Sequence, residues 1–187
     1  MLTQFSRTEL LLGKEAMEKL KNSRVAVFGV GGVGGYVCEA LVRSGVGAFD
    51  LIDDDKVCLT NLNRQIIATR KTIGKYKTNV MKERILDINP DADVRIHQCF
   101  FLPENADDFP FEEYDYIVDA VDTVTAKIAL VMKAKELNVE EVLYMNVQKN
   151  KYAYIVKDGA RGIMLYSDER SLYTKLYKGL KMTPLQP

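Results

Sequence analysis

Residues 25–35 read VAVFGVGGVGG, and residues 51–65 read LIDDDKVCLTNLNRQ. The first stretch begins as an apolar run typical of a buried strand and continues into a glycine-rich loop that opens a helix. Gly29, Gly31 and Gly34 fit the G-x-G-x-x-G spacing of a nucleotide-binding βαβ unit. Glycines suit such a loop because the backbone must turn tightly and let phosphate oxygens approach its amides. We therefore predict a nucleotide phosphate site at this loop.

The second stretch indicates which nucleotide chemistry to expect. A dehydrogenase needs one acidic residue at the end of the second strand to hold the ribose. Here Asp53, Asp54 and Asp55 follow one another, and Asn61 and Arg64 come shortly after. Asp53 is the expected ribose ligand, with Asp55 as the second choice. Because the arginine fork matches phosphate oxygens, the pattern favours chemistry on phosphates over hydride transfer.

Two further positions carry candidate charges. Lys77 would lie in the first turn of a helix, where a cation opposes the helix dipole. Phosphate contact is one reason for its place there, and a solvated surface lysine is the alternative. Asp122 follows the apolar strand in IVDAVDT, where a carboxylate either holds Mg²⁺ on phosphate oxygens or caps the next helix. Asp119, in the same motif, is the less favoured metal ligand.

The overall charge balance gives no sign of a nucleic-acid-binding field. The chain has 187 residues, enough for one domain with a full core, and its 26 basic residues balance its 26 acidic ones. The charges are nevertheless segregated. One interval is basic with Glu83 as its single acid: Arg64, Arg70, Lys71, Lys75, Lys77, Lys82 and Arg84. Residues 104–119 are rich in acids, and the usual explanation of both clusters is a solvated surface.

Cysteine and histidine usage excludes several kinds of site. Cys38, Cys58 and Cys99 form no C-x-x-C pair, which argues against a disulfide scaffold and structural zinc and favours a reducing, cytoplasmic environment. No run approaches a membrane-spanning length, and residues 1–15 lack the layout of a signal peptide. The single histidine, His97, lies in an alternating segment typical of a strand, so histidine-based catalysis is not expected.

Apolar segments of strand length alternate with segments of helical periodicity, which predicts a Rossmann-like α/β fold. We expect strands at residues 24–28, 48–52, 94–98, 116–120 and 142–145. We expect helices at residues 8–20, 32–44, 74–87 and 125–137, and a short one at 104–108. The sheet should be mostly parallel, with helices on both faces. Right-handed crossovers would then bring loops 29–35, 53–64 and 120–123 to one edge, where such sheets bind ligands.

Beyond residue 147 the pattern is weaker. Strands are expected at residues 152–156 and 162–166, and a helix rich in Tyr and Lys at 169–180. The final MTPLQP, residues 182–187, is expected to be a frayed end.

The motifs GVGGVGG, LIDDDKV, TNLNRQ, GKYK and DAVDT, in this order, resemble the adenylating domain of the ubiquitin-activating-enzyme-like superfamily. This group includes the bacterial activators of molybdopterin and thiamine sulfur carriers. The resemblance implies an enzyme that binds ATP and Mg²⁺ and converts a carboxylate into an acyl adenylate. It implies an ATP loop at Gly29, Gly31 and Gly34, a ribose ligand at Asp53, and phosphate contacts from Asn61, Arg64 and Lys77.

The resemblance also implies roles at two further positions. Asp122 would help to hold Mg²⁺ and take part in catalysis with Arg64 and Lys77. Arg7, in the segment QFSRTELLLGKEAM, matches an arginine that reaches across the homodimer of this family into the partner's catalytic site.

Within the superfamily, QFSRTELLLGKEAM, DDDKVCLTNLNRQI and INPDADV are most similar to the branch that dehydrates threonylcarbamoyladenosine in tRNA. The resemblance covers residues 4–139 and implies tRNA carrying that nucleoside as substrate, with sulfur-transfer proteins as further partners. It divides the chain into an ATP-binding adenylating domain, residues 1–147, and a divergent C-terminal segment, residues 148–187. Beyond Asn138 the chain departs from the family pattern and lacks the M-G-A-G-N-type loop expected there.

Three other functions stay open at this point. The first is an adenylyltransferase acting on a ubiquitin-like sulfur-carrier protein. The second is a NAD-dependent oxidoreductase, against which Asn61, Arg64, Lys77 and Asp122 count. The third is a catalytically silent nucleotide-binding or scaffold protein, which the divergent C-terminal segment would fit.

Overall fold

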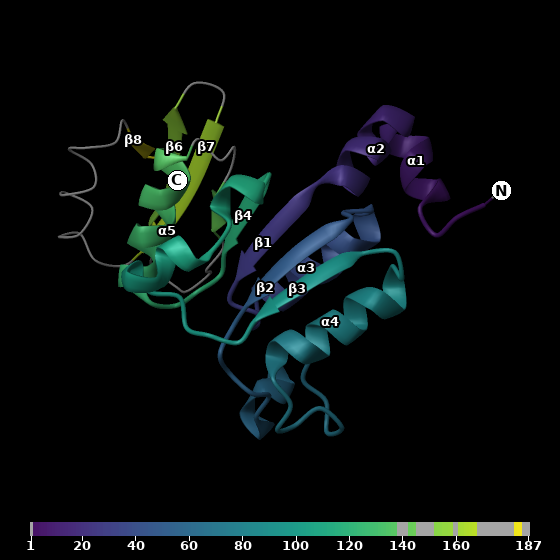
Figure 1. Ribbon diagram of the computed structural model, residues 1–187, viewed down its shortest axis with the longest axis horizontal. Coiled ribbons are helices and arrows are strands. Elements are labelled where there is room, and N and C mark those ends of the chain that lie inside the picture. The colour runs from purple at the N-terminus through teal and green to yellow at the C-terminus, as the bar shows by residue number, and fades with distance from the viewer. Residues whose placement is uncertain (1, 138–141, 145–151, 159–160, 168–181, 185–187) are drawn as a thin grey trace.

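The computed structural model describes residues 2–137, 142–144, 152–158, 161–167 and 182–184. Its centre is a five-stranded parallel sheet in the order β3-β2-β1-β4-β5 (Figure 1). The strands are β1 (Arg24–Phe28), β2 (Ala48–Ile52), β3 (Asp93–His97), β4 (Tyr116–Asp119) and β5 (Val142–Tyr144). The predicted Rossmann-like, mostly parallel sheet is confirmed.

The strand order explains where a ligand can bind. The chain runs outward from β1 through β2 to β3, and then crosses back to place β4 on the other side of β1. The loops that follow β1 and β4 therefore diverge toward opposite faces of the sheet. Folds of this kind bind ligands in the crevice that this divergence opens at the carboxyl ends of the strands.

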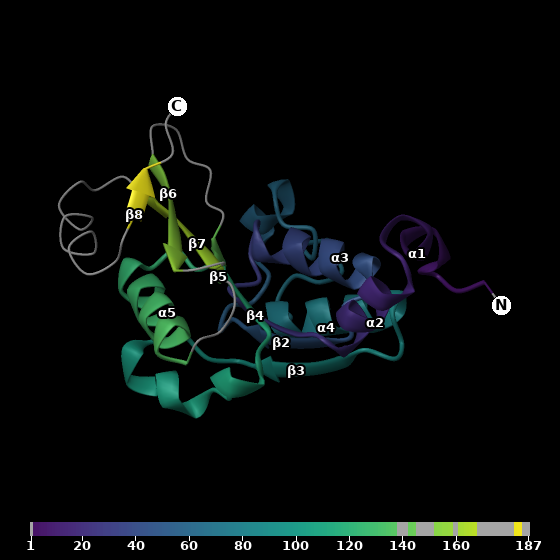
Figure 2. The ribbon, with the colours of Figure 1, turned by 90° about the horizontal axis from the view of Figure 1, so that it is seen from above.

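Helices cover both faces of the sheet, and each face has its own core (Figure 2). On one face, α3 (Gly34–Ser44) and α4 (Lys77–Ile88) bury Val42, Met81 and Ile85 against the sheet. On the other, α5 (Val124–Glu136) and the 3-10 helices η2 (Pro103–Asp108) and η3 (Phe111–Glu113) enclose an aromatic cluster around Phe28. The inner strands β1, β2 and β4 are mostly apolar because both of their faces are buried, whereas β3, beside β2 at the edge of the sheet, alternates polar and apolar residues.

The N-terminal segment corrects one prediction. A single helix is expected over residues 8–20, but the structure has two, α1 (Ser6–Leu12) and α2 (Lys14–Asn22). Gly13 separates them with a φ of 83°, a left-handed conformation that ends a helix and that glycine adopts without strain. Both helices lie near the end of the sheet where β1 begins (Figure 1).

Other element boundaries differ by a few residues. The helix expected from residue 32 begins at Gly34, and the one expected from residue 74 begins at Lys77. Lys56 and Tyr76 form an isolated antiparallel bridge, so residues 74–76 close a loop and cannot start the helix. That loop contains the 3-10 helix η1 (Leu59–Asn63). None of the helices in the described ranges is long and apolar enough to cross a lipid bilayer.

The C-terminal part contains a second, antiparallel sheet of β6 (Tyr152–Asp158), β7 (Arg161–Ser167) and β8 (Met182–Pro184). The two predicted strands are confirmed, each slightly longer than expected. The frayed end predicted for MTPLQP is wrong for its first three residues, because β8 pairs with β6. The helix expected at 169–180 and the boundary between residues 147 and 148 lie outside the described residues.

A buried charge network ties the three strands on one side of the sheet together. The Asp50 carboxylate on β2 is fully buried and accepts hydrogen bonds from Arg24 Nη1 on β1, at 2.7 Å, and from His97 Nε2 on β3, at 2.9 Å. Burial alone would raise the pKa of Asp50, but the bonds from His97 and Arg24 outweigh it and hold this pKa below its usual range.

This network predicts a loss of stability in acid. Because the folded-state pKa of Asp50 is lowered, its contribution is present above the ordinary carboxyl pKa of about 3.9 and is lost as the pH falls through the lower folded-state value. The unfolding free energy of the wild type should therefore fall more steeply below about pH 4 than that of Asp50→Asn, measured by urea denaturation. Parallel curves for the two proteins would contradict this assignment.

Candidate functional site

A cavity of about 600 Å³ opens at the carboxyl edge of the parallel sheet. This volume lies within the range of small-molecule sites, roughly 300–1,000 Å³. The glycine loop after β1, the acidic turn after β2, η1, the start of α4 and the loops after β3 and β4 all contribute to it. Its lining residues include Gly29, Gly31, Asp53, Asp55, Asn61, Arg64, Lys77 and Asp122. The three loops expected to meet at one edge of the sheet do meet there.

Gly29 and Gly34 serve the packing of the loop itself. Gly29 has a φ of 91°, and a Cβ there would lie 2.6 Å from the carbonyl oxygen of Ala120. A Cβ on Gly34 would lie 1.8 Å from the carbonyl oxygen of Gly29. Gly34 is not among the residues that line the cavity, so it closes the turn instead of facing the ligand space. At Gly31 a Cβ would meet only Gln65 Nε2, at 3.7 Å, so this glycine keeps the cavity side of the loop open.

Asp53 is held in a fixed orientation just after β2. Its Oδ2 accepts the amide of Val30 at 2.7 Å, and its Oδ1 accepts the amide of Asp55 at 2.9 Å. The carboxylate side chain is only 8% exposed. Burial raises the pKa of Asp53, and the nearby Lys77 ammonium and the two amides offset part of this rise. An oriented carboxylate at this position is able to accept hydrogen bonds from ribose hydroxyls.

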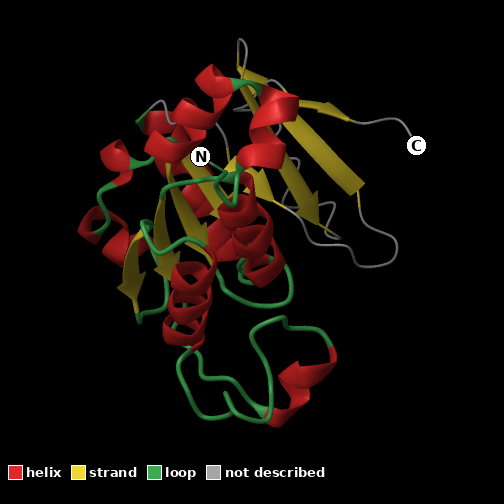
Figure 3. Ribbon diagram, turned by 90° about the vertical axis from the view of Figure 1, so that its right-hand side faces the viewer, coloured by secondary structure: helices red, strands yellow, loops and turns green. Residues whose placement is uncertain are grey.

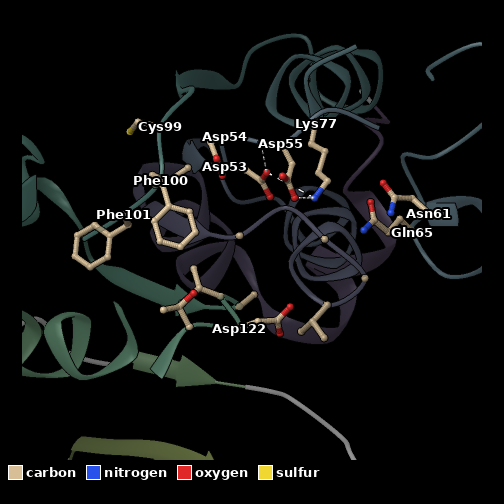
Figure 4. A pocket seen from close by; sticks show the side chains of 18 of the residues that line it. Asp53, Asp54, Asp55, Asn61, Gln65, Lys77, Cys99, Phe100, Phe101 and Asp122 are labelled. Carbon is tan, nitrogen blue, oxygen red and sulfur yellow. Dashed lines mark hydrogen bonds and ion pairs between the residues drawn. The ribbon is translucent and has the colours of Figure 1, made fainter. Parts of the chain in front are cut away.

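Lys77 is buried and paired, so it is not a surface lysine. Its side chain is 7% exposed, and Nζ lies 2.6 Å from Asp55 Oδ2 and 3.7 Å from Asp53 Oδ1 (Figure 4). These two carboxylates offset the unfavourable interaction of a cation with the dipole at the start of α4. Asp55, the second choice for the ribose, is instead the direct partner of this ammonium, with 65% of its side chain exposed.

Asn61 and Arg64 come from η1 and the residue that follows it. Asn61 is buried, and its Oδ1 accepts the amide of Cys58 at 3.0 Å. Arg64 is exposed, and its Nη1 donates to Thr60 O and to Asn63 Oδ1, both at 3.0 Å. These bonds hold the guanidinium at the cavity. In the described part of the chain its Nε and Nη2 donate no hydrogen bond, so they are available to an anion.

Gln65 is a cavity residue that the sequence did not single out. It is buried, and its Oε1 has no hydrogen-bond partner among the described residues, although buried polar atoms are nearly always paired. Figure 4 shows it beside Asn61 on the wall of the cavity. Its place directly after Arg64 in TNLNRQ was the available signal. The segment Cys99, Phe100 and Phe101 after β3 also lines the cavity without having been predicted.

Asp122 and Asp119 have different environments. Asp122 is exposed, lines the cavity, and does not cap α5, whose N-cap is Thr123 without a side-chain bond. Asp119 is fully buried, and its Oδ1 accepts Lys127 Nζ at 3.0 Å and the amide of Val121 at 3.2 Å. Burial raises the pKa of Asp119 and lowers that of Lys127, while their ion pair opposes both shifts. Of the two, Asp122 has the carboxylate that is accessible to a ligand.

Arg7 lies on α1, away from the cavity of its own chain. It is exposed and absent from the lining residues. Neighbouring residues of this segment, Phe5 and Glu9, line a separate hollow with Gly45 and Gly47, which precede β2. The helix therefore lies at the amino edge of the sheet, opposite the cavity. A contribution to the catalytic site of a second copy stays a prediction.

Comparisons with known proteins agree with this geometry. A Bacillus subtilis tRNA threonylcarbamoyladenosine dehydratase is 52% identical over 130 residues, which cover 70% of this chain and 51% of that protein. The crystal structure of the E. coli tRNA N6-threonylcarbamoyladenosine dehydratase in complex with ATP superposes with a TM-score of 0.74 at 35% identity, covering 81% of this chain and 64% of that one.

A Mycobacterium tuberculosis protein named "Probable adenylyltransferase/sulfurtransferase MoeZ" is 37% identical over 116 residues, which cover 62% of this chain and 29% of that protein. The chain spans about half the length of the curated dehydratases it matches. Residues 5–144, which contain the whole parallel sheet and every residue of the cavity, match the ThiF family. The chain therefore belongs to the ThiF family.

Proposed function

We propose that this chain is an ATP-dependent tRNA threonylcarbamoyladenosine dehydratase, which activates the threonylcarbamoyl carboxylate by adenylation. One observation carries the proposal. An open glycine loop, an oriented carboxylate and two cations line a single cavity, at Gly31, Asp53, Arg64 and Lys77. The 52% identity to the Bacillus subtilis dehydratase and the likeness to the ATP complex of the E. coli enzyme support the choice of substrate.

The cavity residues suggest how ATP would lie. The ribose hydroxyls would bind the Asp53 carboxylate, and the phosphates would pass over Gly31 and Gly32, where the glycine loop lines the cavity and its backbone can approach an anion closely. Arg64 offers two unused donor groups to the phosphates. Lys77 would share its charge between Asp55 and the phosphate oxygens. The unpaired Oε1 of Gln65 is an acceptor on the cavity wall, which a hydroxyl or amino group of the ligand would pair with.

The residues present also fit a magnesium ion. Asp122 would hold it, because its exposed carboxylate faces the cavity and Mg²⁺ prefers oxygen ligands. When bound, the ion would neutralise part of the negative charge of the phosphates. Asp119 would not be a ligand, since its carboxylate is fully buried, pairs with Lys127 and does not line the cavity.

A carboxylate needs activation because its oxygen is a poor leaving group. In the proposed reaction this carboxylate attacks the α-phosphate of ATP, the bond to pyrophosphate breaks, and an acyl adenylate forms. An atom of the modified nucleoside then attacks the acyl carbon and loses its proton, and AMP departs with the original carboxylate oxygen. Arg64 and Lys77 would stabilise the charge that builds on the phosphoryl oxygens, and no cysteine nucleophile is needed.

The proposal includes an assembly and a setting. Arg7 of a second copy would complete the catalytic site in a homodimer, which explains why it lies away from the cavity of its own chain. The tRNA substrate would place the reaction in the cytoplasm. Sulfur-transfer proteins are proposed as further partners by the family resemblance alone.

The decisive experiment is incubation of the protein with ATP and tRNA that carries threonylcarbamoyladenosine. We expect release of AMP and pyrophosphate, and a loss of one water from the nucleoside in the mass spectrum. The same reaction with unmodified tRNA is the control and should release no AMP. ATP–pyrophosphate exchange that requires a small carrier protein ending in Gly-Gly would favour the adenylyltransferase instead. ATP binding without AMP from either substrate would indicate a silent nucleotide-binding protein.

A further inference from the structure

The loop between η1 and α4 carries only positive charge. From residue 56 to residue 82 the chain has seven basic residues and no acidic one. Arg64 and Lys77 line the cavity, and Lys82 donates to the backbone of β3. The other four are exposed and do not line the cavity, one of them before η1 and three between η1 and α4: Lys56, Arg70, Lys71 and Lys75. We call these four residues the basic rim.

The basic rim is poorly neutralised by the rest of the protein. Arg70 and Lys71 form no ion pair with any residue of the described ranges, and the pair between Lys75 and Glu83 is long, at 3.9 Å, and exposed. Lys56 lies over the ring of Tyr76, with Nζ 4.8 Å from its centroid. A surface loop that only needs solvation tolerates both signs of charge, and mixed signs avoid self-repulsion. A single-sign loop beside a cavity favours an anionic partner.

Hydrogen bonds hold the backbone of the basic rim in place. Thr72 Oγ1 donates to Ile67 O and accepts the amide of Thr69, both at 2.8 Å. The amide of Gly74 donates to Val57 O, and the amide of Val57 donates to Lys75 O. Figure 3 shows the segment projecting from the body of the molecule as green loop around a short helix. The backbone that carries these charges is therefore held in place by hydrogen bonds.

Exposed carboxylates also line the cavity. Asp54 and Asp122 line it and are exposed, and Cys99 on the loop after β3 lies close to both Asp54 and Asp108. The Asp54 carboxylate lies within 4.8 Å of those of Asp53 and Asp55, and both of these carboxylates pair with Lys77, so acidic and basic side chains stand together at this part of the cavity. The attraction for a polyanion therefore comes from the basic rim outside the cavity, in the interval from residue 56 to residue 82 that contains no acidic residue.

We propose that the basic rim binds the phosphodiester backbone of the tRNA substrate and so directs the modified nucleoside into the cavity. The inference rests on the proposed function and adds the surface that its substrate would use. ATP cannot be the partner of the rim, because these four side chains lie outside the cavity. A nucleic acid fits because its phosphates present a repeating negative charge that unpaired Lys and Arg side chains bind, while a flipped or unstacked base enters a pocket.

The test compares two double variants that remove the same charge. R70Q/K71Q changes the rim, and K14Q/K19Q changes exposed lysines of α2, at the far edge of the sheet. Binding of tRNA is followed by fluorescence anisotropy from low to high KCl, without ATP. We expect R70Q/K71Q to weaken binding about tenfold near 0.1 M salt and to reduce the salt slope by roughly 1.5, as for two lost phosphate contacts. K14Q/K19Q should bind as the wild type does.

Further measurements separate failure of this inference from failure of the proposed function. The charge-conserving R70K/K71R should restore binding, and ATP affinity should be unchanged in all variants. If both double variants weaken tRNA binding equally, or if neither weakens it, the proposal that the basic rim binds tRNA is overturned. If R70Q/K71Q alone loses tRNA binding but the wild type releases no AMP, the proposed dehydratase function is overturned and the proposal that the rim binds tRNA stands. If R70Q/K71Q binds tRNA normally but no longer binds an acidic carrier protein, the rim serves another partner and the inference is overturned.

Discussion

Replacing Arg64 by alanine is expected to lower the rate of AMP formation by about 100-fold or more. Its guanidinium lies at the cavity, held through Nη1 by Thr60 O and Asn63 Oδ1. Donors that are already oriented stabilise developing charge without rearrangement at the moment of reaction, so their loss acts mainly on the transition state. The measurement is single-turnover AMP release with saturating ATP and tRNA carrying threonylcarbamoyladenosine.

Arg70→Ala is the matched control, because Arg70 belongs to the same loop but does not line the cavity. This variant should raise the KM for tRNA and leave the rate at saturation unchanged. Arg64→Ala should instead lower the rate at saturation. Near-normal turnover in Arg64→Ala would remove this residue from the mechanism, and a drop in both variants would show that the loop acts only through charge at a distance.

Replacing Gly34 by alanine is expected to lower the unfolding free energy by about 3 kcal/mol. The new Cβ would lie 1.8 Å from the carbonyl oxygen of Gly29, so backbone and not a flexible side chain would have to move. The first turn of α3 and the glycine loop would separate. Urea denaturation followed by circular dichroism gives the change in midpoint and slope.

Gly31→Ala is the informative counterpart because its Cβ meets only Gln65 Nε2, at an ordinary 3.7 Å. This variant should fold with nearly wild-type stability. Its methyl group would protrude where phosphates approach the amides, so ATP affinity should fall at least about tenfold, equivalent to ~1.4 kcal/mol. Calorimetric titration with ATP measures it. If Gly31→Ala binds ATP normally, the phosphates do not pass over this residue.

Much of the fold followed from local patterns. The bounds of β1 and β2 match the predicted ranges because parallel strands buried on both faces are mostly apolar. The meeting of the three loops at one edge followed from the handedness of crossovers, which does not depend on side-chain detail. The break at Gly13 was missed because the amphipathic spacing continues across it, and only the backbone angle shows the turn.

The sequence predicted the site less well where side chains from distant parts of the chain pair with one another. Lys77 and Asp55 are 22 residues apart, and only folding shows that the ammonium is held by this carboxylate. The burial of Gln65 depends on the wall formed by Gly31. Asp119 and Asp122 look alike in the motif IVDAVDT. Lys127, eight residues after Asp119, pairs with the buried Asp119, while Asp122 stays accessible at the cavity.

The close approach of Gly29 to Ala120 has a mechanical consequence. A Cβ on Gly29 would lie 2.6 Å from the carbonyl oxygen of Ala120, so the turns after β1 and β4 touch with no space between them. The amides of the glycine loop and the Asp122 carboxylate are thus carried by two turns that pack directly against each other. Their spacing is set when the chain folds, and the entropy of aligning them is not lost again each time a nucleotide arrives.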